Sequence, residues 1–156
     1  MWAPTDIHTH LLEWGVTHVT GVPDTTFGPW FDHFSRSPAI RLVPVCREGE
    51  AWGVAAGLFL GGARPIVMIQ CTGLFESGDA LRNVLFDLQL PLYAIVGYRN
   101  YLNRQSASAD SALRYTEPIL RAWGLDPLLV ESPQQIEHLR AHYFASRDAQ
   151  SPGVAL

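Results

Sequence analysis

Residues 47–57 read Arg47-Glu48-Gly49-Glu50-Ala51-Trp52-Gly53-Val54-Ala55-Ala56-Gly57, and this stretch decides the fold of the chain. It follows a β-prone run and predicts a helix that begins with a carboxylate and continues through small side chains. Because Gly and Ala have little or no side chain, another surface can approach such a helix closely. A flat ligand could therefore be held against a carboxylate at the start of this helix.

Helical and extended segments alternate on both sides of this stretch. We expect strands at 18–22, 41–46, 65–70, 92–96 and 128–130, and the start of a last strand at 154–156. We expect helices at 5–14 (with Thr5 as N-cap and Gly15 as the stop), around 27–34, and at 48–60, 77–88, 113–123 and 133–147, with a polar loop over 97–111. Aliphatic strands that alternate with helices predict a three-layer α/β/α fold with a mostly parallel sheet covered on both faces.

Ligands of such a sheet bind at the carboxyl ends of its strands. The loops that leave those ends are Pro23-Asp24-Thr25, Cys46-Arg47-Glu48, Cys71-Thr72-Gly73 and Tyr98-Arg99-Asn100. We therefore look for functional residues in these loops.

The composition is that of an ordinary globular protein. The 156 residues are 47% hydrophobic and 17% charged, with a net charge of −4, and this length suits a single domain over 1–156. The negative charge gives no support for a nucleic-acid partner, and no apolar run is long enough to span a membrane. The N-terminal residues lack the features of a signal peptide and two cysteines cannot form a disulfide framework, so we expect a cytoplasmic protein.

Several other residues have structural interpretations. Core or subunit interface is expected for three aromatic residues of the 27–34 helix, Trp30, Phe31 and Phe34. Trp52 is a candidate interface anchor. Cys46 and Cys71 are interpreted as buried structural cysteines because no His in the neighbouring loops could activate a thiol. His8 and His10 resemble a metal-binding pair, but their place in a helical run favours surface residues.

Glu48 on its own has two interpretations. A Glu in the first turn of a helix is common, because its charge complements the helix dipole. A catalytic role would need a carboxyl that is shielded from water and able to share a proton, and only a partner surface over the site could provide that shielding. The segments around Glu48 decide between the two.

Those segments resemble the pyrimidine-binding (PYR) domain of thiamine-diphosphate (ThDP) dependent decarboxylases, in particular sulfopyruvate and phosphonopyruvate decarboxylases. The resemblance covers most of the chain. The matching segments, in order, are Gly21-Val22-Pro23-Asp24; Arg47 to Gly57, in which the spacing to Gly57 selects Glu48 over Glu50; Gln70, Gly73, Leu74, Ser77, Ala80 and Leu81; Pro91 with the strand that ends at Gly97-Tyr98-Arg99; and Arg114, Thr116 and Glu117.

The resemblance implies a role for each matching residue. Glu48 would hydrogen-bond the N1′ atom of the ThDP aminopyrimidine and so activate the cofactor. Pro23, Gly73 and Leu74 would line the aminopyrimidine pocket. The residues expected to contact the substrate, a small 2-oxoacid, are Asp24, Thr25 and Glu76.

The chain also departs from the family pattern. Cys71, Phe75, Glu76 and Asp79 stand where similar relatives have Asn, Gly, Asn and Asn. Gly28 replaces a Lys that would suit a sulfonate or phosphonate, which argues against a doubly anionic substrate. With no His between His33 and His138, proton transfer to the substrate would fall to Asp24, Glu76 or Asp110, to the amine of the cofactor, or to a partner chain.

A second subunit is implied by a missing motif. Family members bind the diphosphate and Mg²⁺ through a separate domain with Gly-Asp-Gly followed by Asn-Asn, which supplies the oxygen ligands that Mg²⁺ needs. Gly78-Asp79-Ala80 has no Asn-Asn after it and falls within a predicted helix. We therefore expect no metal site in this chain, Mg²⁺ bound by a partner that carries the diphosphate-binding domain, and a hetero-oligomer with ThDP between the two chains.

Three alternatives stay open at this point. The altered segment from Cys71 to Asp79 would suit a ThDP-dependent carboligase or aldehyde-transferring enzyme. The chain could instead be a non-catalytic binding or regulatory module that kept the fold, although the presence of Glu48 argues against this. An unrelated flavodoxin-like domain that binds a small molecule is the third.

Overall fold

Five parallel strands form the centre of the fold in the computed structural model, which describes residues 2–106 and 109–156. The strands are β1 (His18–Gly21), β2 (Arg41–Pro44), β3 (Pro65–Gln70), β4 (Tyr93–Gly97) and β5 (Gly153–Ala155). Their order across the sheet is β2-β1-β3-β4-β5, and each neighbouring pair is parallel. The order reverses between β1 and β3, and such a switch point is where parallel sheets bind ligands.

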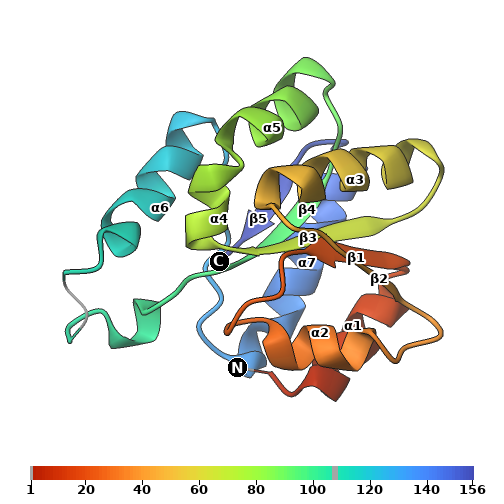
Figure 1. Ribbon diagram of the computed structural model, residues 1–156, viewed down its shortest axis with the longest axis horizontal. Coiled ribbons are helices and arrows are strands. Elements are labelled where there is room, and N and C mark those ends of the chain that lie inside the picture. The colour runs from red at the N-terminus through yellow and green to blue at the C-terminus, as the bar shows by residue number, and fades with distance from the viewer. Residues whose placement is uncertain (1, 107–108) are drawn as a thin grey trace.

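Helices cover both faces of this sheet (Figure 1). One face carries α3 (Glu48–Leu60), α4 (Cys71–Glu76), α5 (Gly78–Arg82), the π-helical turn η1 (Asn83–Asp87) and α6 (Ser111–Ala122). The other face carries α1 (Pro4–Glu13), α2 (Gly28–Phe34) and α7 (Ile136–Asp148). Two 3-10 turns complete the chain, η2 (Tyr101–Asn103) and η3 (Pro133–Gln135).

The central strand β3 shows why the layers form. Its side chains alternate between the two hydrophobic clusters: Val67 and Ile69 pack on the α3 side, and Ile66 and Met68 on the α1 side. All four are 0% exposed, as expected for a strand covered on both faces. The predicted three-layer α/β/α fold with a parallel sheet is confirmed.

Two of the predicted elements have the predicted bounds, namely α3 at 48–60 and β3 at 65–70. The stop at Gly15 is also confirmed, since this residue has a φ of 78° after the end of α1. The N-cap prediction for Thr5 is wrong, because α1 begins at Pro4 with Ala3 as N-cap. Proline is favoured at the first helical position, where its fixed φ suits the helix and its missing N–H costs nothing.

Two other predictions fail around the sheet. The helix predicted at 77–88 begins earlier, at Cys71, and is divided into α4, α5 and η1, so Cys71-Thr72-Gly73 forms the first turn of a helix and not a loop. The strand predicted at 128–130 is reduced to an isolated bridge between Leu128 and Ala155. Its partner β5 is only three residues long, which leaves little strand to pair with.

The aromatic and cysteine predictions have mixed outcomes. Burial in the core is confirmed for Trp30, Phe31 and Phe34. Trp52 is 0% exposed and packs in the core, so it is not an exposed interface anchor. Cys71 is buried as predicted, but Cys46 is exposed. The part of the predicted 97–111 loop that contains Ala107 and Ser108 lies outside the described residues.

Within the part of the chain that the structure describes, no helix is long and apolar enough to cross a membrane.

Candidate functional site

The loops at the carboxyl edge of the sheet lie against one another. The backbone N–H of Val45 donates to the carbonyl of Gly21 at 3.0 Å, so the chain leaves β1 and β2 side by side. The loop after β1 also reaches the end of β4, where a Cβ on Gly97 would lie 2.8 Å from Cγ2 of Thr26. The predicted site residues from these loops are therefore gathered at one edge.

Glu48 begins α3 at this edge, and its side chain lies on Gly73. A Cβ added to Gly73 would lie 2.5 Å from Oε1 of Glu48 and 2.6 Å from its Cδ, distances too short for any real contact. Gly73 sits in the first turn of α4, directly after β3. Only a glycine at this position leaves room for the Glu48 carboxyl, so two residues predicted to hold the cofactor are in contact.

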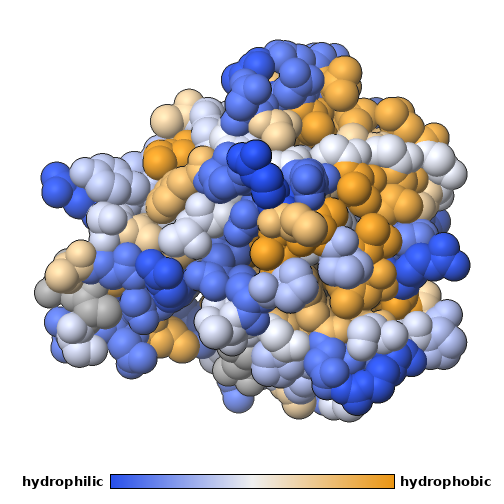
Figure 2. Space-filling view, in the orientation of Figure 1, coloured by the Kyte–Doolittle hydropathy of each residue, from blue (hydrophilic) through white to orange (hydrophobic). Residues whose placement is uncertain are grey.

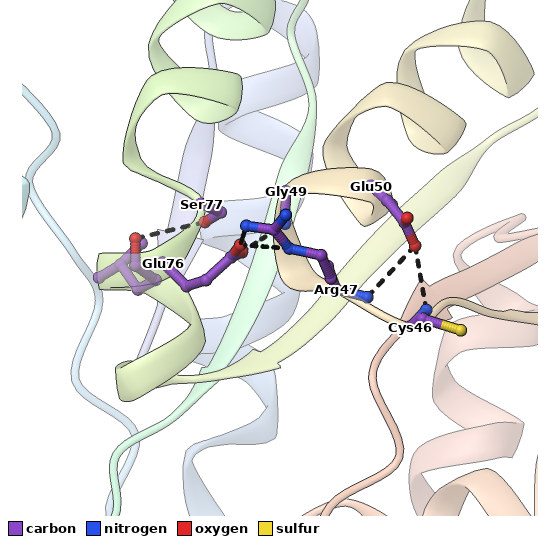
Figure 3. Close-up of polar contacts among 7 residues, drawn as sticks. Cys46, Arg47, Gly49, Glu50, Glu76 and Ser77 are labelled. Atoms are coloured by element: carbon purple, nitrogen blue, oxygen red, sulfur yellow. Dashed lines mark hydrogen bonds and ion pairs between the residues drawn. The ribbon is translucent and has the colours of Figure 1, made fainter.

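Two other carboxylates near Glu48 are occupied by backbone groups (Figure 3). Glu50 turns back on its own helix, where its Oε2 accepts from the backbone N–H of Cys46 at 3.0 Å and of Arg47 at 3.2 Å. Glu76 reaches across from α4. Its Oε2 accepts from the N–H of Gly49 at 2.9 Å, and its Oε1 accepts from Nη2 of Arg47 at 2.5 Å and from Nε at 3.0 Å.

Glu48 differs from both of these residues. No described residue donates a hydrogen bond to its carboxylate, and none forms an ion pair with it, whereas Glu50 and Glu76 are each held by at least two donors. The side chain is partly buried. It can therefore accept or share a proton with a group that approaches from outside the chain, which agrees with the choice of Glu48 over Glu50 from the sequence.

Asp24 caps the turn that leads into α2. Its Oδ1 accepts from the backbone N–H of Thr26 at 2.6 Å and of Phe27 at 2.7 Å. Pro23 and Thr25 on either side are exposed. One Asp24 oxygen thus stabilises the loop, while the neighbouring residues face outward at the edge of the sheet.

Leu74 packs in the core and is 0% exposed. One turn further along, the buried hydroxyl of Ser77 accepts from Nε1 of Trp52 at 3.0 Å and donates to the carbonyl of Leu74. This bond ties α3 to the α4–α5 junction. Trp52 therefore fixes the position of α3 from inside the molecule.

The end of β4 holds a separate polar group. Asp110 accepts from Nε and Nη2 of Arg99, from the side chain of Asn100 at 2.8 Å and from the N–H of Ala112 at 3.0 Å. These donors lower the pKa of Asp110. Tyr98 donates to the carbonyl of Leu113 at 3.1 Å, and burial together with Glu117 raises the pKa of Tyr98 to about 12.

The sequence did not indicate a role for Arg47, although it was quoted as part of the motif. Its guanidinium forms an ion pair with Glu76, a residue twenty-nine positions away in sequence. A cation next to the first acidic residue of a helix was the available signal, but the identity of its partner depends on how α4 packs.

A hydrophobic cavity of about 200 Å³ lies at the ends of β4 and β5, lined in part by Phe27, Trp30 and Tyr98. Neither Glu48 nor Gly73 lines it. We place the candidate site at Glu48 nevertheless, because its carboxylate packs on Gly73 and accepts no hydrogen bond from a described residue. A site that lies between two chains need not form a cavity in one of them.

The small residues of α3 face in two directions. Ala51 and Ala55 are buried against the sheet, whereas Gly53 and Gly57 are exposed and a Cβ on either would meet no atom within 4 Å. Figure 2 shows a hydrophilic band where the start of α3 faces α4 and hydrophobic surface over the rest of α3, where Leu60 is 70% exposed. The outer face of this helix is thus open to close approach.

Among residues 2–106 and 109–156, no group of three or more His, Cys, Asp or Glu side chains is placed to hold a metal ion. Asp79, the acidic residue of the incomplete Gly-Asp motif, pairs with Arg82 at 3.0 Å on α5.

Comparison with known proteins identifies the family. The model described as "Thiamine pyrophosphate enzyme, N-terminal TPP binding domain" matches residues 1–115. The chain belongs to this family. The match includes Pro23, Glu48 and Gly73, and it excludes the unrelated flavodoxin-like domain that the fold alone would allow.

Curated relatives fall into two groups. Sulfopyruvate decarboxylase subunit alpha of Methanococcus maripaludis is 27% identical over 120 residues, which are 77% of this chain and 72% of that protein. The corresponding subunit of Methanocaldococcus jannaschii is 22% identical over 129 residues, or 83% of this chain and 76% of that protein. Phosphonopyruvate decarboxylase of Streptomyces viridochromogenes is 34% identical over 99 residues, which are 64% of this chain but only 25% of that enzyme.

Proposed function

We propose that this chain is one subunit of a ThDP-dependent 2-oxoacid decarboxylase, in which it holds and activates the aminopyrimidine of the cofactor. Membership of the TPP-binding family and the names of the relatives support this proposal. The observation that carries it is the Glu48 carboxylate, which lies against Gly73 and is hydrogen-bonded to no described residue.

The residues at the site fit the aminopyrimidine. Gly73 has no side chain in the space that the Glu48 carboxyl occupies, and the carboxyl is free to bond a ring nitrogen. Glu48 would hold N1′ of the cofactor and share a proton there, with Pro23 and Gly73 beside the ring and Leu74 packed in the core behind Gly73. When bound, ThDP would supply a nucleophilic carbon for the 2-oxoacid carbonyl and a cationic thiazolium ring that takes up the electron pair left by the departing carbon dioxide.

A partner surface completes the environment of Glu48. Proton sharing at N1′ requires that water be excluded from the carboxyl, but Glu48 is only partly buried in this chain. The open face of α3 allows a second chain to approach. We propose that the second chain carries the diphosphate-binding domain and binds Mg²⁺ there, and that the two chains form a hetero-oligomer. The subunit names of the relatives support this arrangement.

The proposed substrate is a small 2-oxoacid, with Asp24, Thr25 and Glu76 as its predicted contacts. Gly28 at the start of α2 offers no charge to a sulfonate or phosphonate, and no atom lies within 4 Å of where its Cβ would be. Glu76 and Asp24 add negative charge at the same edge of the sheet. An uncharged tail beyond the 2-oxoacid group therefore suits the site better than a second acid group.

Two of the candidate carboxylates, Glu76 and Asp110, are poor proton donors to the substrate. Backbone donation from Gly49 and the guanidinium of Arg47 lower the pKa of Glu76, and Arg99 and Asn100 lower the pKa of Asp110. A general acid works best with a pKa near the operating pH. We therefore assign proton delivery to Asp24, to the amine of the cofactor or to a group of the partner chain.

Turnover of the assembled complex tests the proposal. Glu48→Gln should lower kcat by about 10² to 10⁴, the usual contribution of one acid–base group, while the two chains still co-purify. Glu50→Gln is the matched control: its amide oxygen can still accept from the N–H groups of Cys46 and Arg47, so its kcat should stay near that of the unmodified complex. Equal activity of both variants would contradict the role of Glu48.

The products separate decarboxylation from carbon–carbon bond formation. With a 2-oxoacid alone, we expect carbon dioxide and the free aldehyde in equal amounts. A second reaction contains the 2-oxoacid together with an added aldehyde. If the added aldehyde is incorporated into a hydroxyketone product and little free aldehyde is released from the 2-oxoacid, the carboligase alternative is correct. If the complex neither binds ThDP nor turns over any 2-oxoacid, the chain is a non-catalytic module.

A further inference from the structure

Glu76 holds the residues on both sides of Glu48. Its carboxylate accepts from the N–H of Gly49 at 2.9 Å and from Nη2 of Arg47 at 2.5 Å. Arg47 precedes Glu48 in the chain and Gly49 follows it. One side chain from α4 therefore contacts both chain neighbours of Glu48, the guanidinium of Arg47 and the backbone N–H of Gly49, as Figure 3 shows.

This contact is one of three successive contacts between the two helices. Gly73 lies under the Glu48 side chain, Glu76 binds the N–H of Gly49, and Ser77 accepts from Trp52. The contacts of Gly73 with Glu48 and of Ser77 with Trp52 hold α3 against α4. Glu76 binds the backbone N–H that directly follows Glu48, so together with the packing on Gly73 it sets the direction of the Glu48 side chain.

The charge of Glu76 also decides what Arg47 does. The guanidinium bonds Glu76 through Nε and Nη2 and is thereby kept from the carboxylate next to it in the chain. An arginine paired with Glu48 would stabilise its anion and oppose proton sharing. Glu76 thus takes the hydrogen bonds of this cation, and no described residue forms an ion pair with Glu48.

We propose that Glu76 is a positioning residue, which directs Glu48 toward the cofactor through Gly49 and keeps Arg47 away from it. The proposal rests on the proposed function of Glu48. It differs from the substrate contact that the sequence predicts for Glu76, because a positioning residue acts before any substrate binds.

The test is the rate at which the thiazolium proton of bound ThDP exchanges with deuterium in the assembled complex without substrate. Glu76→Ala should slow this exchange about 10- to 100-fold, the loss expected when the first turn of α3 moves by a fraction of an ångström. Glu76→Gln should slow it less, because its amide oxygen can still accept from Gly49. The matched control is Asp79→Asn, which removes an acidic residue one turn further along that pairs with Arg82.

Two further readouts complete the experiment. The Gly49 amide should exchange with solvent faster in Glu76→Ala than in the unmodified chain, and kcat should fall while KM for the 2-oxoacid stays within about threefold. An unchanged thiazolium exchange rate, or a change in KM alone, would overturn the proposal in favour of a substrate contact. If neither Glu76→Ala nor Glu48→Gln slows the thiazolium exchange, the proposed function of Glu48 is wrong. If Glu48→Gln slows the exchange and Glu76→Ala does not, only the positioning role of Glu76 is wrong. Glu76→Gln gives the decisive comparison if Glu76→Ala does not assemble.

Discussion

The first turns of α3 and α6 both have backbone N–H groups that need acceptors, and the two helices obtain these acceptors in different ways. At α6 a single carboxylate, Asp110, accepts from the N–H of Ala112 and pairs with Arg99. At α3 these tasks fall to Glu50 and Glu76, which bind the backbone N–H groups of Arg47 and Gly49. Glu48 is left without either task. A carboxylate at the start of a helix usually accepts hydrogen bonds from the free backbone N–H groups there. A carboxylate that accepts none of them, such as Glu48, is therefore the better candidate for a role in catalysis.

The largest effect in this comparison should come from Gly73→Ala. Its Cβ would enter the space of the Glu48 carboxyl, and a displacement of about 1 Å at a reacting group can cost about 10²-fold in rate. We therefore expect kcat of the assembled complex to fall by about two orders of magnitude. Gly78→Ala is the matched control, because a Cβ there would lie at an ordinary contact distance of 3.5 Å from Trp123. Gly53→Ala lies on the open face of α3 and is used on the isolated chain instead.

Gly53→Ala also has an effect of its own on the isolated chain. Alanine is more favourable than glycine inside a helix by about 0.5–1 kcal/mol, so urea unfolding should show a more stable protein. If Gly73→Ala kept full turnover, the packing of Glu48 on Gly73 would not be what positions the carboxyl.

The second effect concerns α6. Asp110→Ala should lower the free energy of unfolding by about 0.5–2 kcal/mol, the usual cost of losing an N-cap, and leave kcat of the assembled complex unchanged. Asp110→Asn should keep most of the stability, because an amide oxygen can still accept from Ala112. A loss of kcat as large as that of Glu48→Gln would remove the difference between the two helix starts.

The smallest effect is a dependence on pH. The pKa of Glu76 is lowered from its usual 4.5 by the Gly49 N–H and Arg47. A carboxyl with a lowered folded pKa stabilises the protein above its unfolded pKa, and this contribution is lost as the pH falls through the folded value. The stability difference between the unmodified chain and Glu76→Gln should therefore be constant above about pH 5 and shrink below pH 4.5. A difference that grows on acidification would contradict the assignment of the ion pair.

The sequence predicted the elements whose patterns are strong and local. The small-residue helix α3 and the aliphatic strand β3 have the predicted bounds, and Glu48, Gly73 and Asp24 are brought to the same edge of the sheet. In contrast, α4 was missed because Thr72 and Gly73 have low helix propensity. The helix is stabilised there by tertiary contacts, including those of Glu76 and Ser77 with α3.

The less predictable features depend on contacts between distant residues. The sequence predicts Trp52 as a candidate interface anchor, but its indole N–H bonds Ser77 and the ring is buried. The ion pair between Arg47 and Glu76 spans the same two helices. Neither can be deduced from spacing, because the register of α3 against α4 is decided by packing. The proposed role of Glu48 follows only from the order of the residues around it.

The most direct test of the account is the exchange of the thiazolium proton of ThDP in the assembled complex, compared between Glu48→Gln and Glu50→Gln. We predict that Glu48→Gln slows the exchange by at least about 10²-fold and that Glu50→Gln leaves it within about twofold of the unmodified complex. Equal exchange rates in the two variants, with ThDP bound in both, would contradict the claim that the free carboxylate at the start of α3 activates the cofactor.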